Sequence, residues 1–111
     1  MPRETRKLLF DCQELETAAM DHCRRHGITV PEGALSALSV GTDPAMAVRL
    51  RFGVGEGAGE LHLSQRQIGD ALIDYCQESG IPIPRGALKS VRAEAGAIAI
   101  MIEAGIEHRA A

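Results

Sequence analysis

The chain has 111 residues, of which 45% are hydrophobic and 24% charged, the proportions of a globular protein; its length predicts one domain over residues 1–111. Its net charge of −3, with no basic half or tail, argues against general electrostatic capture of nucleic acid or of an anionic membrane. No segment approaches the ~18 apolar residues of a membrane span, and the first residues lack the apolar stretch of a signal peptide. We therefore expect a cytoplasmic protein that does not bind membranes.

The first predicted elements are a strand at residues 7–10 and a helix at 12–26. The helix start is marked by a capping box, in which Asp11 is the N-cap and Glu14 stands three residues later. Its end is marked by Gly27, which suits the left-handed residue that follows a helix, and Pro31 prevents continuation.

Two strands are expected next, at residues 35–40 and 46–52. The second alternates apolar and polar side chains, which is typical of a strand with one buried face. The first is weaker, and a short helix opened by Pro31 is the alternative.

Residues 53–59 form a glycine-rich connector. Its spacing does not match a dinucleotide-binding loop, because Ala58 occupies the third glycine position, and no Gly-Lys-Ser/Thr follows. Glu56 and Glu60 would also repel phosphate. We expect a linker.

The second half is predicted to repeat the order of the first: a strand at 60–63, a helix at 65–79 and strands at 88–94 and 98–102. Ser64 and Gln67 form a second capping box, and Gly80 and Pro84 again follow the helix. A short helix opened by Pro84 is again the alternative for the weaker strand.

The two halves also share a motif, 53 residues apart. Residues 21–35 and 74–88 both read Asp-x-Cys-x-x-x-Gly-Ile-x-(Val/Ile)-Pro-x-Gly-Ala-Leu, and nine of the nineteen positions aligned from 17–35 and 70–88 are identical. Unrelated segments would share about one or two. We predict an internal duplication of a β-α-β-β unit, with repeat 1 at about 6–54 and repeat 2 at about 60–105. The predicted fold is α+β, an antiparallel sheet with the two helices on one face and a pseudo-twofold axis.

Aliphatic side chains must build the core, because the chain has one tyrosine, two phenylalanines and no tryptophan. Both helices carry an apolar stripe at i, i+3, i+4 and i+8. His22 and Tyr75 are expected at the edge of this stripe, with a solvated tip. The predicted core comprises Leu15, Ala19, Cys23, Met46, Val48, Leu50, Ile68, Leu72, Cys76, Ile98, Ile100 and Ile102.

The spacing of the candidate residues argues against both a catalytic site and a metal site. Asp21, His22 and Cys23 are consecutive on a helix, so their side chains point about 100° apart and cannot meet. Cys23 and His26 are three residues apart and could chelate, but Cys12 lies about 16 Å away along the helix, too far to share a zinc ion. We expect buried, reduced cysteines, no catalytic residues, no cofactor and no metal.

Charged residues are the candidates for partner binding. Asp70, Asp74 and Glu78 lie at four-residue intervals on the second helix. They form either a face that is exposed to solvent or a ridge that binds a partner. On the first helix, Asp21 is expected to pair with Arg25. The basic candidates lie on predicted strands and after the second helix. The residues predicted to bind a partner are Arg49, Arg51, Arg85, Lys89, Arg92, Asp70, Asp74 and Glu78.

Our leading hypothesis is a protein–protein interaction or adaptor module without catalytic activity, which forms a homodimer or docks onto a larger protein. It depends on sheet edges that need a partner, and on an outer face where Ala47, Ala99 and Met101 mix with arginines. The alternative is a nucleic-acid-binding regulator that uses the basic residues, although exposed aromatics for base stacking are not expected. A third hypothesis is an enzyme with its site between the two repeats, for which the sequence indicates no substrate.

Overall fold

The computed structural model describes residues 3–42, 45–84, 86–95 and 97–105. In this part of the chain the fold is α+β, with two helices and two antiparallel three-stranded sheets. The elements in chain order are β1 (Arg3–Phe10), α1 (Cys12–His26), β2 (Leu35–Gly41), β3 (Ala47–Phe52), the short 3-10 turn η1 (Gly55–Gly57), β4 (Gly59–Ser64), α2 (Gln65–Glu78), β5 (Leu88–Glu94) and β6 (Ala97–Gly105).

Both helices begin where their capping boxes predict. The side chain of Asp11 accepts a hydrogen bond from the backbone N–H of Glu14 at 2.9 Å, and the Glu14 carboxylate accepts one from the N–H of Asp11 at 3.0 Å. Ser64 and Gln67 make the same pair of bonds at the start of α2. Gly27 follows α1 with φ +66°, the left-handed conformation expected there. The short-helix alternative for residues 35–40 and 88–94 is wrong, because these residues form strands β2 and β5 as predicted.

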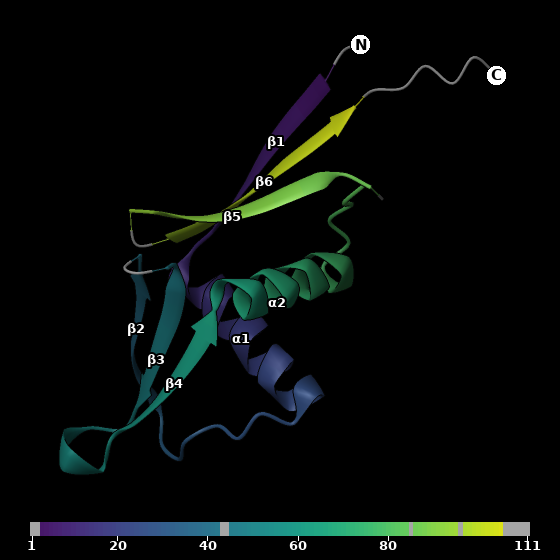
Figure 1. Ribbon diagram of the computed structural model, residues 1–111. Coiled ribbons are helices and arrows are strands. Elements are labelled where there is room, and N and C mark those ends of the chain that lie inside the picture. Colours follow the sequence, from purple (N-terminus) through teal and green to yellow (C-terminus); the bar gives the residue numbers. More distant parts are fainter. Residues whose placement is uncertain (1–2, 43–44, 85, 96, 106–111) are drawn as a thin grey trace.

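The prediction of a single sheet is wrong, because the strands form two sheets, β2-β3-β4 and β1-β6-β5 (Figure 1). Strand β1, from the first half, pairs with β6 in the register Leu8 to Ile100, and β4, from the second half, pairs with β3 in the register Leu63 to Val48. Each hairpin therefore gains its third strand from the other half of the chain. A two-stranded hairpin is marginally stable in water, and a third strand with an apolar face stabilises it.

The predicted core is confirmed, since all the residues assigned to it are buried in one cluster that draws on both helices and both sheets. The two helices lie next to each other in the angle between the sheets (Figure 1). The ring of Phe10, at the end of β1, meets the ring of Tyr75 on α2 edge-on, with 6.2 Å between centroids. Among the described residues, neither helix is long and apolar enough to cross a bilayer.

Two residues are more buried than the sequence predicts. His22 is buried, with 6% of its surface exposed, because α2 packs beside α1 and covers the edge of the apolar stripe. Ala99 lies on the outer face of β6, as predicted, but it is fully buried. It is small and lies in the central strand, between Leu9 of β1 and Arg92 of β5.

Candidate functional site

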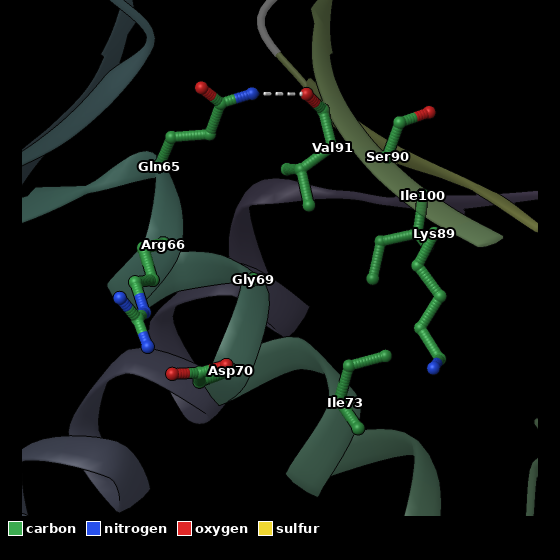
Figure 2. Close-up of a pocket in the computed structure, with 9 residues that line it drawn as sticks. All are labelled: Gln65, Arg66, Gly69, Asp70, Ile73, Lys89, Ser90, Val91 and Ile100. Carbon is green, nitrogen blue, oxygen red and sulfur yellow. Dashed lines mark hydrogen bonds between the residues drawn. The ribbon is translucent and has the colours of Figure 1, made fainter. Parts of the chain in front are cut away.

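A groove of about 480 Å³ lies between α2 and β5 (Figure 2). Helix α2 supplies one wall, strand β5 the other, and β6 contributes one side chain between them. The lining residues are Gln65, Arg66, Gly69, Asp70 and Ile73 from α2, Lys89, Ser90 and Val91 from β5, and Ile100 from β6.

The apolar part of the groove is formed by Ile73, Val91 and Ile100. Ile100 belongs to the core, whereas Ile73 and Val91 are half-buried. Gly69 allows α2 to approach β5 closely, since a Cβ atom built at this glycine would lie 3.2 Å from Cγ2 of Val91. The glycine therefore sets the width of the groove at its middle.

Strand β5 lies at the edge of its sheet, and its backbone faces the groove. The side-chain amide of Gln65 donates a hydrogen bond to the backbone carbonyl of Val91 at 2.7 Å (Figure 2). An amide group from α2 thus occupies a position on β5 that the amide of a neighbouring strand would take.

The charged side chains of the groove are exposed and come from both walls. Arg66 and Asp70 lie on α2, opposite Lys89 on β5 (Figure 2). Asp70 and Lys89, two of the residues predicted for partner binding, are therefore brought to one site. The rest of the groove could not be predicted from the sequence, because Gly69 and Gln65 acquire their roles only when α2 packs against β5.

The other predicted basic residues do not join this site. Arg49 and Arg51 are exposed on β3, in the other sheet, and Arg51 is paired in register with Glu60. Arg92 is exposed on β5, with its side chain on the outer face of the strand. Arg85 lies outside the described residues. The basic set is thus divided between two sheets.

The rest of the predicted acidic ridge faces α1. Arg25 of α1 forms ion pairs with Asp74, at 3.8 Å between Nη1 and Oδ2, and with Glu78. The predicted pairing of Asp21 with Arg25 is wrong, because Arg25 extends across to α2 and Asp21 instead pairs with Arg24 at 2.6 Å. The ridge therefore helps to hold the two helices together.

Next to these ion pairs, His22 and His26 lie one turn apart on α1, with 4.3 Å between ring centroids and 40° between the ring planes. One nitrogen of each ring and a carboxylate oxygen of Asp74 all lie within 4.8 Å of one another. Burial lowers the pKa of His22, as does the nearby His26, while Asp70 and Asp74 act in the opposite direction. The i, i+4 spacing of the histidines was visible in the sequence, but their approach to Asp74 required the helix packing.

The cysteines differ in exposure, which gives a testable prediction. Cys23 and Cys76 are fully buried, and burial raises the pKa of both thiols, whereas Cys12 is exposed. Alkylation needs an accessible thiolate. We expect iodoacetamide to label Cys12 quickly, and Cys23 and Cys76 only as the protein unfolds, as followed by peptide mass spectrometry with and without denaturant. Equal labelling of all three in the native protein would contradict the packing of both helices.

Within the described residues, polar side chains converge at both the groove between α2 and β5 and the seam between α1 and α2. Comparisons with protein-family models, with curated proteins and with solved structures found no match for this chain.

Proposed function

We propose that the chain is a cytoplasmic protein–protein interaction module without catalytic activity, which binds an extended segment of a partner protein in the groove between α2 and β5. The observation that carries this proposal is the edge strand at the groove, where the carbonyl of Val91 already accepts a hydrogen bond from the Gln65 amide. Extended peptides add to exposed sheet edges through main-chain hydrogen bonds, and adjacent pockets receive their side chains.

The lining of the groove indicates what such a segment would carry. Its volume of about 480 Å³ falls within the range of ligand pockets. Ile73 and Val91 favour an aliphatic side chain, and Arg66 and Lys89 favour an acidic residue beside it. Asp70 would disfavour a second acidic residue on the α2 side. We therefore expect a short extended peptide with an aliphatic and an acidic residue.

The test is selection of peptides from a displayed library on the immobilised protein, followed by fluorescence anisotropy. Reversing both cations of the groove, in the double variant Arg66→Glu and Lys89→Glu, should weaken binding at least about tenfold, as for loss of a central contact. Reversing Arg49 and Arg51 to Glu makes the same change of charge on the other sheet and should leave affinity unaltered. Equal loss in both double variants, or loss only in the control, would contradict the groove as the site.

A nucleic-acid-binding regulator is the second candidate. It is supported by Arg49 and Arg51, which are both exposed on one face of β3. Each phosphate contact releases counterions, so affinity for nucleic acid should fall steeply with salt. Peptide binding in the groove should fall much less, because its apolar contacts do not depend on salt. Phe52, the aromatic residue of this strand, is buried and offers no stacking surface. Salt-sensitive binding to DNA or RNA that is lost in Arg49→Glu with Arg51→Glu would favour this candidate.

We also propose that the chain forms a homodimer through the outer face of the β1-β6-β5 sheet. Leu9 and Leu88 are 58% and 63% exposed, and both lie on this face, since they pair with Ala99 and Glu103 of β6, which are four residues apart. Twofold pairing is a common way to cover such a surface. Sedimentation at micromolar concentration should show a dimer that Leu9→Lys with Leu88→Lys converts to monomer; a monomeric wild type would contradict it.

We also propose that the chain is an internal duplication of one β-α-β-β unit. It is supported by the shared motif, by the two capping boxes and by the common order of strand, helix, strand and strand in each half. An experimental structure in which residues 6–54 and 60–105 fail to superpose would contradict it.

A further inference from the structure

The seam between α1 and α2 holds a cluster of metal-ligating groups that is separate from the groove. His22 and His26 are four residues apart on α1 and therefore lie on the same face of the helix. Asp74 comes from α2, and the three potential ligand atoms lie within 4.8 Å of one another. We propose that this cluster binds a divalent first-row transition metal ion such as Zn²⁺, through one nitrogen of each ring and one oxygen of Asp74.

The geometry needs a small adjustment to hold an ion. Bonds of about 2.0–2.2 Å to a tetrahedral ion bring its ligand atoms to about 3.5 Å from one another. Because the three atoms lie within 4.8 Å of one another, each separation has to close by at most about 1.3 Å to reach that arrangement. His26 is exposed and Asp74 half-buried, so their side chains can rotate, while His22 is fixed in the packed seam. The ion would enter from the solvent side of His26.

An independent observation at His22 also points to a ligand. This side chain is more than nine-tenths buried, and its Nδ1 atom has no hydrogen-bond partner among the residues that the structure describes. Buried polar atoms are nearly always satisfied, and one that is not calls for a missing partner. Coordination of a metal ion through this nitrogen would supply that partner.

Arg25 would compete with the metal ion for the carboxylate of Asp74. Its guanidinium lies 3.8 Å from the Asp74 carboxylate and also pairs with Glu78. A bound dication would replace Arg25 as the partner of the Asp74 carboxylate, and Arg25 would keep its ion pair with Glu78. Three protein ligands leave one position of a tetrahedral ion for water or for an incoming donor. The site would clamp α1 to α2 and so join the two halves of the chain.

The test uses the full chain after treatment with EDTA and dialysis. Titration with Co²⁺ should produce visible ligand-field absorption that saturates at one ion per chain and disappears when Zn²⁺ is added. His26→Gln and Asp74→Asn should each weaken binding at least about tenfold, since even groups that only support metal ligands have effects of this size. His62→Gln removes an exposed histidine of β4 and should have no effect.

Arg25→Gln provides a variant with the opposite effect, because it removes a cation beside Asp74. It should bind Co²⁺ several-fold more tightly than the wild type, which a folding defect would not produce. Circular dichroism checks that each variant is folded. The proposal is overturned if binding does not saturate, if His26→Gln and Asp74→Asn bind as well as His62→Gln, or if Arg25→Gln binds no more tightly than the wild type.

Discussion

Leu72→Ala is expected to lower the free energy of unfolding by about 2–5 kcal/mol, the range for a large-to-small change that leaves a cavity in a packed core. Leu72 is fully buried on α2, within a cluster that includes side chains from α1 and from both sheets. Because Leu72 is fully enclosed in this packed cluster, its neighbours can fill the space only in part. Equilibrium unfolding in urea measures the loss as a lower midpoint at unchanged slope.

The matched control is Leu9→Ala, which removes the same atoms from an exposed position on the outer face of β1. It should change the free energy of unfolding by less than about 0.5 kcal/mol, measured at a concentration where the chain is monomeric. Equal effects of the two substitutions would mean that the buried face of α2 has been assigned wrongly.

Helices and core were predictable because their signals are local. A capping box needs residues three apart, such as Ser64 and Gln67, and its hydrogen bonds form within one turn. The apolar stripe of each helix repeats with the helical period, so it identifies the buried face without knowledge of what covers it. This period predicts that Leu15 and Ile68 belong to the core, and both are fully buried.

The pairing of strands was not predictable in the same way. The pattern of β1 or β4 shows one apolar face, and such a face fits the edge of either hairpin. Only the three-dimensional arrangement shows that Leu8 lies beside Ile100 and Leu63 beside Val48, which produces two sheets in place of one.

The candidate sites depend on contacts between elements, which explains why the sequence revealed them in part. Asp70 and Lys89 were visible as charged residues, but their positions on opposite walls of one groove depend on how α2 lies against β5. Arg25 had a suitable partner on its own helix, Asp21, and nevertheless pairs with α2. A long side chain on a helix can reach a neighbouring helix as easily as its own next turn. Spacing along one helix therefore could not decide between the two partners.

Gly59→Ala is the second substitution expected to have a large effect, with a loss of about 1–3 kcal/mol from overpacking. A Cβ atom at Gly59 would lie 2.6 Å from Cβ and 3.1 Å from Cγ of Pro31, in the segment between α1 and β2. The proline ring cannot rotate away, because its atoms are tied to the backbone. Either this segment or the start of β4 must move, and β4 is held there by its pairing with Phe52.

Gly57→Ala is the control, two residues earlier in the same glycine-rich connector. A Cβ atom at Gly57 would have no neighbour within 4 Å among the described residues, and its φ lies outside the range that L side chains rarely adopt. The free energy of unfolding should therefore change by less than about 0.5 kcal/mol. In the sequence the two glycines are equivalent members of one alternating run, and what separates them is the approach of Pro31. Similar effects of the two substitutions, in urea unfolding, would show that Pro31 does not pack against the start of β4.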